Sequence, residues 1–283
     1  MKKPELLSAS SYPEELSDLG DHVPKTLWMR GSLETLQVRP RVAIVGTRRA
    51  TSYGLRVTRE LSAAVARAGA CVVSGLAAGI DGAAHRAALE ADGATIAVLG
   101  TGINRAFPVG NRRLQDEIAE KGLLLSELEP DDHGMPFSFV HRNRIIAALS
   151  SLVLVVEAPI KSGALITARQ ALELGRDVAA VPGPIDQPQS VGANALIREG
   201  AQIISSADDL LALIGLTPAL RMARADPASD EGRVWSALAD GPLDMDTLCT
   251  MSGLPAADCM VAVTALEIAG SIECAMTGEI RRR

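Results

Sequence analysis

The sequence predicts an α/β fold built on a doubly wound, mostly parallel sheet. Between residues 41 and 216, seven short runs of mainly Val, Ile, Leu and Ala alternate with stretches of helical periodicity. The runs are apolar throughout, which is typical of parallel strands covered on both faces. Helices of about 10–15 residues between such strands indicate crossover connections. We therefore predict a Rossmann-like domain over 41–216 that binds its ligands at the carboxyl ends of the strands.

The predicted elements alternate strictly along this domain, so the helices are expected to cover both faces of the sheet. In chain order, the strands and the helices after them are RVAIVGT with 54–68, ACVVSGL with 79–92, TIAVLG with 111–121, LLLSEL with 141–150, LVLVVEA with 162–174, DVAAVPG with 191–199 and AQIISS with 207–214.

Two irregular segments frame this domain. Residues 1–40 are spotted with Pro and Ser and are too short for a domain of their own. We predict a lead-in segment that packs Leu27, Trp28 and Met29 on the core. Residues 217–231 have the Pro, Ala and acidic composition of a linker.

The last segment, 232–283, predicts three short helices and a β-hairpin around Thr277 and Gly278, which is the layout of a winged-helix domain. Residues 226–283 contain ten acids and four bases, so the whole net charge of −6 lies there. The candidate recognition helix, 255–270, has no Lys or Arg, although phosphate contacts need cations. We favour a protein-contact or regulatory role, with recognition of duplex DNA as the alternative.

Several classes of function lack support in the sequence. Four cysteines without a C-x-x-C pair and four histidines without a zinc-binding grouping predict no metal. The turn VGTRRATSYG lacks the G-x-G-x-x-G of NAD proteins, and Lys161-Ser162 lacks the upstream Gly of a P-loop, so we predict no cofactor. The chain has neither a long apolar run nor a signal-peptide region, which predicts a cytoplasmic protein without a membrane partner.

Three turns at strand ends are candidate anion sites. We expect each to offer small residues and free backbone N–H groups near a helix N-terminus, two of them with a cation, and these features favour anions. Adjacent anion sites suit a polyanion, and the six arginines between residues 39 and 59, where no acid occurs, add positive charge. The alternative is that the glycines only permit close packing. The turns are Gly46-Thr47-Arg48, Ser74-Gly75 through Gly79, and Lys161-Ser162-Gly163.

The run HRNRIIAALS adds Arg142 and Arg144 at the start of a predicted helix. Because they are two positions apart they point in different directions, so one can face a ligand while an acid such as Glu127 or Glu157 holds the other inside. Phe137 and Phe139 stand just before them in what reads as a polar loop. Exposed aromatic rings beside arginines suit stacking on unpaired bases, and the alternative is that they anchor the loop to the core.

No catalytic constellation stands out. Asp81 and His85 are four positions apart on the predicted helix after Gly79 and share a face, so they could form an acid–base pair. Both are also ordinary residues for such a helix, and we favour the structural role. No G-x-S-x-G, no Cys/His set and no carboxylate cluster rises above background.

These pieces, in this order, resemble the DNA-processing protein DprA (Smf) family of bacteria. The resemblance spans about residues 41–214 and extends to the winged helix. The motifs that carry it are VAIVGTRRATSYG, SGLAAGIDGAAH, TIAVLGTGINRAFPVGN, RNRIIAALS, EAPIKSGALITARQALELGRDVAAVPG and SVGANALIREGA.

The resemblance implies a homodimeric protein that is not an enzyme, binds single-stranded DNA, protects incoming strands during natural transformation and helps to load RecA recombinase onto them. It also implies that Arg48, Arg142, Asn143, Lys161 and Ser162 line the DNA pocket, where Phe139 stacks a base. The full set of DNA-binding residues that we predict is Gly46, Arg48, Ser74, Gly75, Gly79, Phe139, Arg142, Asn143, Arg144, Lys161, Ser162, Gly163 and Thr167.

Two other classes of protein are weighed against this one. A Rossmann-like nucleotide phosphoribohydrolase also uses a Gly-rich strand end, but it needs a P-G-G-x-G-T-x-x-E stretch. The nearest text here, KSGALITARQALE, lacks the paired Gly and the Glu at that spacing. A pure scaffold acting through the winged helix would leave the arginine-rich rim without a role.

Overall fold

The computed structural model describes residues 3–216, 226–275 and 278–282. The chain forms two compact units, Met1–Leu210 and Leu211–Arg283, and each has its own hydrophobic core. Most of the linker predicted over 217–231, and Thr277 at the predicted hairpin turn, lie outside the described residues.

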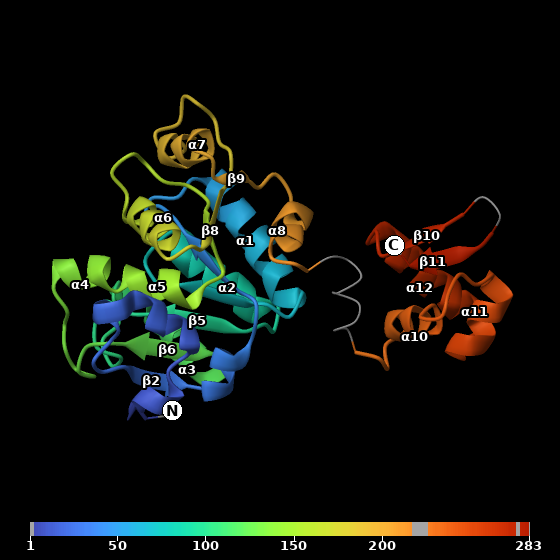
Figure 1. Ribbon diagram of the computed structural model, residues 1–283, viewed down its shortest axis with the longest axis horizontal. Coiled ribbons are helices and arrows are strands. Elements are labelled where there is room, and N and C mark those ends of the chain that lie inside the picture. The colour runs from blue at the N-terminus through green and yellow to red at the C-terminus, as the bar shows by residue number, and fades with distance from the viewer. Residues whose placement is uncertain (1–2, 217–225, 276–277, 283) are drawn as a thin grey trace. The chain divides into compact units, whose positions relative to one another are not determined.

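The first unit is built on one nine-stranded sheet with the order β1-β2-β6-β5-β4-β3-β7-β8-β9 (Figure 1). From β6 to β9 all neighbouring strands are parallel, whereas β2 is antiparallel to β1 and to β6. The chain order reverses at β3 and β7, and such a switch point is where open α/β sheets bind ligands. The strands are β1 (Glu5–Leu6), β2 (Trp28–Gly31), β3 (Arg41–Val45), β4 (Cys71–Ser74), β5 (Thr95–Val98), β6 (Leu123–Ser126), β7 (Leu152–Val155), β8 (Asp177–Ala180) and β9 (Gln202–Ile203).

Seven helices between residues 52 and 213 stand where the sequence predicts them, and their ends differ from the predicted ends by a few residues. They are α1 (Ser52–Arg67), α2 (Ile80–Glu90), α3 (Arg112–Lys121), α5 (Asn143–Leu149), α6 (Gly163–Glu173), α7 (Val191–Arg198) and α8 (Ala207–Leu213). With the strands, they confirm the predicted doubly wound, mostly parallel α/β fold.

A further helix, α4 (Pro136–His141), corrects the prediction of a polar loop before the R-N-R run. It is six residues long and has a proline in its first turn. A segment this short contains too few turns for its apolar residues to show a helical period, so the sequence pattern could not reveal it.

The central strands of the sheet, β3 to β7, are buried on both faces, as their apolar sequences predict. Successive residues of β5 point to opposite sides: Ile96 and Val98 belong to the core cluster that includes α5 and α6, and Ala97 belongs to the cluster that includes α2 and α3. The helices cover the two faces accordingly (Figure 1). All seven residues of α5 are buried.

The N-terminal segment contributes two strands and part of the core. β2 extends the sheet beyond β6, and Leu27 and Met29 are buried on the α5 side while Trp28 packs against the opposite cluster. The 3₁₀ segment Glu14–His22 adds Leu16 and Leu19 to the same core.

The second unit contains the predicted three helices and hairpin, α10 (Asp230–Ala237), α11 (Met245–Ser252), α12 (Ala256–Ile268), β10 (Ile272–Cys274) and β11 (Ile280–Arg282). The core of this unit includes Trp235 and Leu266, and the guanidinium carbon of Arg282 lies 4.3 Å from the centroid of the Trp235 ring. The prediction of a small winged-helix domain is confirmed. Its candidate recognition helix, α12, carries no basic residue.

Within the residues that the structure covers, no single helix has both the length and the apolar composition of a membrane span. One pair of helices, α11 and α12, meets those criteria jointly, with a bend of 104° between them.

Candidate nucleic-acid interface

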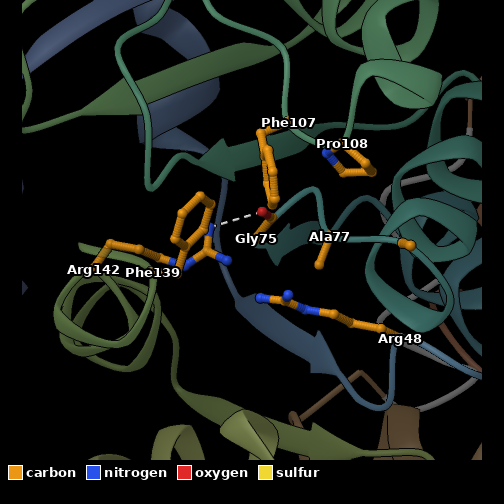
Figure 2. A pocket seen from close by; sticks show the side chains of 8 residues that line it. Arg48, Gly75, Ala77, Phe107, Pro108, Phe139 and Arg142 are labelled. Carbon is orange, nitrogen blue, oxygen red and sulfur yellow. Dashed lines mark hydrogen bonds between the residues drawn. The ribbon is translucent and has the colours of Figure 1, made fainter. Parts of the chain in front are cut away.

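A pocket of about 130 Å³ opens at the carboxyl ends of β3, β4 and β5 in the first unit (Figure 2). Its walls come from the loops that follow these three strands and from the short helix α4. The residues that line it are Arg48, Gly75, Ala77, Ala78, Phe107, Pro108, Phe139 and Arg142.

Arg48 supplies an accessible positive charge in this pocket. It lies in the loop between β3 and α1, its side chain is exposed, and Figure 2 shows it extending into the cavity. Its guanidinium carbon is 6.0 Å from the centroid of the Phe139 ring, which is the distance of a cation–π contact.

Phe139 supplies an aromatic surface opposite this charge. It is half-buried on α4 and packs on Phe107, with ring centroids 4.8 Å apart and an interplanar angle of 48°. Gly100 makes room for it, because a Cβ there would lie 2.6 Å from the Phe139 ring. Phe137, on the same helix, is 69% exposed and does not line the pocket, so neither ring is a buried core anchor.

Arg142 forms a wall of the pocket and is itself buried. It donates hydrogen bonds to the carbonyl oxygen of Gly75 (2.7 Å), to that of Val98 and to Oδ1 of Asn143 (2.9 Å). Burial lowers the pKa of Arg142 to about 10, with Asp81 opposing and Arg48 adding to that shift. A Cβ at position 75 would overlap the guanidinium, so glycine is required there. The guanidinium is therefore largely used in holding the β4 and β5 ends together.

Arg144 points elsewhere, as the two-residue offset from Arg142 predicts. Its two terminal nitrogens donate to the two carboxylate oxygens of Glu127 at 2.6 and 2.5 Å, and its Nε donates to the carbonyl oxygen of His22. It does not line the pocket. Of the two acids considered for this pair, the structure selects Glu127.

Of the predicted loop residues Gly46, Ser74, Gly75 and Gly79, Gly75 lines the pocket and the other three do not. The expectation that their turns offer free N–H groups is wrong in part. The N–H of Gly75 donates to Oδ2 of Asp81 at 3.2 Å. The Ser74 hydroxyl donates to the carbonyl oxygen of Ile44 at 2.7 Å. The acceptor of the Gly75 N–H is only six positions along the chain, but the sequence pattern does not show that the Asp81 side chain folds back onto this turn.

Gly79 needs its glycine for a steric reason. Its φ of +78° and the approach of the Thr47 carbonyl oxygen exclude a side chain. The close-packing alternative therefore holds at this position.

The predicted residues of the third turn form a separate group beside the pocket. Lys161 and Gly163 are exposed, Ser162 caps α6 by accepting a hydrogen bond from Ala164, and Thr167 is buried and donates to the Gly163 carbonyl oxygen. They do not line the pocket. Asn143 joins the two groups: it accepts from Arg142, and its Nδ2 donates to the Gly163 carbonyl oxygen at 3.4 Å.

Two of the pocket-lining residues, Phe107 and Pro108, were not predicted from the sequence, and Ala77 and Ala78 were included only as part of the turn from Ser74 to Gly79. Phe107 carried a usable signal, because it is one of the three phenylalanines of the chain and follows the β5 strand end at the same rim.

Asp81 and His85 are both buried, and each bonds to other groups. His85 Nδ1 lies 2.8 Å from the Thr95 hydroxyl, while Asp81 accepts from Gly75. Among the described residues, no group of three or more His, Cys, Asp and Glu side chains could hold a metal ion.

Burial of His85 predicts a loss of stability in mild acid. Burial, assisted by the charge of Arg142, lowers the pKa of His85 to about 3, so the folded state holds the neutral ring. The contribution of neutral His85 to the free energy of unfolding is complete above the unfolded-state pKa of about 6.5 and declines as the pH falls towards 3. We expect the unfolding free energy to drop by about 2 kcal/mol from pH 6.5 to pH 5.

Urea unfolding followed through Trp28 in a Trp235→Phe background restricts this measurement to the first unit. His85→Gln should remove most of the drop. The comparison also separates the effect of His85 from that of Asp81. Burial raises the pKa of Asp81, so the contribution of Asp81 to the free energy of unfolding rises as the pH falls, whereas that of His85 falls. An identical pH dependence in both proteins would contradict the assignment.

The fold defines the class of this protein: a Rossmann-like α/β unit followed by a winged-helix unit. The family model of DNA recombination-mediator protein A matches residues 5–215, and that of the DprA winged helix domain matches residues 218–275. The chain therefore belongs to the DNA recombination-mediator protein A (DprA) family, as its motifs predict.

Relatives from several bacteria support this assignment. The chain is 45% identical over 201 residues to DNA processing protein DprA of Streptococcus pneumoniae, covering 71% of this chain and 70% of the relative. It is 37% identical over 283 residues to protein Smf of Escherichia coli, covering 96% of this chain and 75% of the relative.

Two solved structures have the same fold. DNA processing protein A of S. pneumoniae matches with a TM-score of 0.71 and 43% identity over 75% of each chain. DNA processing protein A of Helicobacter pylori, whose structure is described for its single-stranded DNA binding mode, matches with a TM-score of 0.68 and 33% identity over 75% of this chain and 97% of that one.

Proposed function

We propose that this protein binds single-stranded DNA in the pocket between Arg48 and Phe139. The observation that carries the proposal is the pairing of an exposed guanidinium with an aromatic ring in one cavity. A cation binds the phosphate of an unpaired strand while an aromatic ring stacks its base. Neither contact reads a base edge, so binding should tolerate any sequence.

The strand would continue from the pocket towards α6. Lys161 is exposed there, and no acid stands in the first turn of that helix. Asn143 connects the two places through its hydrogen bonds, so Arg48, Phe139, Asn143 and Lys161 are the residues we assign to the DNA path. Arg144 is left out because its donors are taken by Glu127 and His22.

Preference for single strands over duplex follows from the same geometry. The Phe139 ring is half-buried inside a cavity of about 130 Å³, so a base must leave its stack to reach it. A paired base cannot do so without the cost of unpairing. The single-stranded DNA binding described for the H. pylori relative supports this reading.

The test is fluorescence anisotropy with labelled oligonucleotides of several sequences, single-stranded and duplex. We expect Arg48→Ala to weaken single-strand binding and to reduce the slope of log affinity against log salt by about 1, because one phosphate contact is lost. Arg49→Ala is the matched control, since Arg49 is the next residue, is also exposed and does not line the pocket. Equal affinity for duplex, or equal effects of the two substitutions, would refute the proposal.

Protection of incoming strands during natural transformation and loading of RecA recombinase are further parts of the proposal, and family membership supports them. We expect the purified protein to retain RecA in a pull-down and to speed RecA assembly on oligonucleotides already coated by a single-strand-binding protein. A failure in both assays would remove RecA loading from the proposal and leave DNA binding intact.

Family resemblance also supports a homodimer formed through the first unit. Light scattering coupled to size-exclusion chromatography should give twice the chain mass of 29.6 kDa. A single chain mass at micromolar concentration would contradict it.

No chemical step enters this proposal. A nucleotide phosphoribohydrolase, the competing enzyme class, would release a free base from nucleoside monophosphates, and we expect the purified protein to release none.

A further inference from the structure

The two glycine-rich turns after β3 and β4 stand where Rossmann-like folds commonly bind a phosphate. In those folds the anion accepts hydrogen bonds from loop N–H groups and lies at a helix N-terminus. In this protein both turns already contact a carboxylate of the chain itself.

Glu157 is the carboxylate at the β3–α1 turn. It follows the end of β7 and is only 2% exposed. Its Oε2 accepts from the N–H of Thr51 at 2.9 Å, and its Oε1 accepts from the Thr51 hydroxyl at 2.5 Å. Its main-chain oxygen accepts from the N–H of Thr47 at 2.7 Å. Glu157 thus makes side-chain and main-chain contacts to the same turn.

The charge of Glu157 faces a helix N-terminus. Thr51 is the N-cap residue of α1, and the positive end of the helix dipole stabilises a negative group there. Within the described residues, no Lys, Arg or His nitrogen lies within 4.0 Å of the Glu157 carboxylate. The carboxylate therefore holds the position of a bound anion with no side-chain cation of its own.

Asp81 is the carboxylate at the β4–α2 turn. It is 6% exposed in the first turn of α2, and its Oδ2 accepts from the N–H of Gly75. Burial raises the pKa of Asp81, while Arg142 and the backbone N–H groups of Ala77, Gly75 and Gly46 counter that effect. The groups that stabilise its charge therefore come from both turns.

The glycines of these turns show that the space is filled. A Cβ on Gly54, in the first turn of α1, would overlap the Glu157 carboxylate. A Cβ on Gly46 would come within 2.5 Å of the Ile80 side chain and 2.8 Å of the Glu157 main-chain oxygen. The Glu157 carboxylate therefore fills the space beside Gly54 in the first turn of α1.

We propose that Glu157 and Asp81 are specificity-determining residues whose carboxylates occupy the phosphate positions of the fold and thereby exclude free phosphate and nucleotides. Phosphate binding is then left to side chains on the open rim. One phosphate meets few such cations, whereas a strand meets several at once, so the arrangement selects polymer over monomer. This goes beyond the proposed function by stating which ligands the fold rejects.

The test compares Glu157→Ala with Glu157→Gln and uses inorganic phosphate as the probe. Both changes remove the charge, but only alanine opens the space. The readout is the melting temperature of the full chain with phosphate against chloride at equal ionic strength. We expect phosphate, at ten times the dissociation constant of the Glu157→Ala protein, to raise the melting temperature of that protein by about 3 °C or more. The melting temperatures of the wild type and of Glu157→Gln should not rise.

A folded Glu157→Ala protein that responds to phosphate no more than the wild type would overturn the proposal. If Glu157→Ala does not fold, the melting temperature of the wild type is measured with and without millimolar ADP. An unchanged melting temperature supports the proposal, and a rise of about 3 °C overturns it. Because no DNA is present, this outcome is independent of whether the protein binds single strands.

Discussion

Arg142→Ala should destabilise the first unit by about 3–5 kcal/mol, because it removes a buried guanidinium that donates several hydrogen bonds and leaves their buried acceptors unsatisfied. Asp81 would lose the cation that most favours its ionised form, and the carbonyl oxygens of Gly75 and Val98 would lose their donor. The measurement is urea unfolding followed through Trp28 in a Trp235→Phe background.

Arg113→Ala is the control, because Arg113 is exposed and its replacement should change stability by no more than about 0.5 kcal/mol. A double-mutant cycle with Asp81→Asn gives a sharper test, since removing both charges should cost less than the sum of the two single changes. A loss below about 1 kcal/mol in Arg142→Ala would show that its hydrogen bonds do not stabilise the fold as we describe, and strict additivity in the cycle would show that Arg142 and Asp81 are not coupled.

Phe139→Ala should lower the affinity for single-stranded DNA by about 5- to 150-fold, the range that corresponds to loss of one stacked base. The salt dependence should stay unchanged, because no phosphate contact is removed. Duplex binding should fall much less. The measurement is anisotropy with labelled oligonucleotides over a salt series.

Phe137→Ala is the matched control, because it removes the same side chain from the same short helix at a position outside the pocket. Phe139→Trp should preserve binding, since it keeps an aromatic face. Melting curves of each variant exclude a change of fold as the cause. If Phe139→Ala and Phe137→Ala had equal effects, stacking in the pocket would be refuted.

The fold was predictable because its information is local. The central parallel strands, β3 to β7, are covered on both faces and are therefore mainly apolar, as in the run from Leu152 to Val155. Each crossover is long enough to show helical periodicity. The short helix α4 and the antiparallel β2 are too short to show a period, so they were visible only in the structure.

The candidate site, like the fold, was predicted from the sequence in part and revealed by the structure in part. The accessible charge of Arg48 and the ring of Phe139 could be selected from residue type and position at a strand end. The different directions of Arg142 and Arg144 could be predicted from their spacing of two residues. The acid that pairs with Arg144, Glu127, could be identified only in the structure.

The sequence alone determined the doubly wound sheet, the winged-helix unit, the family and the strand ends that form the rim. Only the tertiary structure decided which of the groups at that rim are free to bind. Glu157 reaches Thr51 across 106 positions, and Arg142 reaches Gly75 across 67. The sequence of the turn before α1 is the same whether its N–H groups are free or bonded, because the Glu157 carboxylate that accepts from Thr51 comes from the end of another strand when the chain folds.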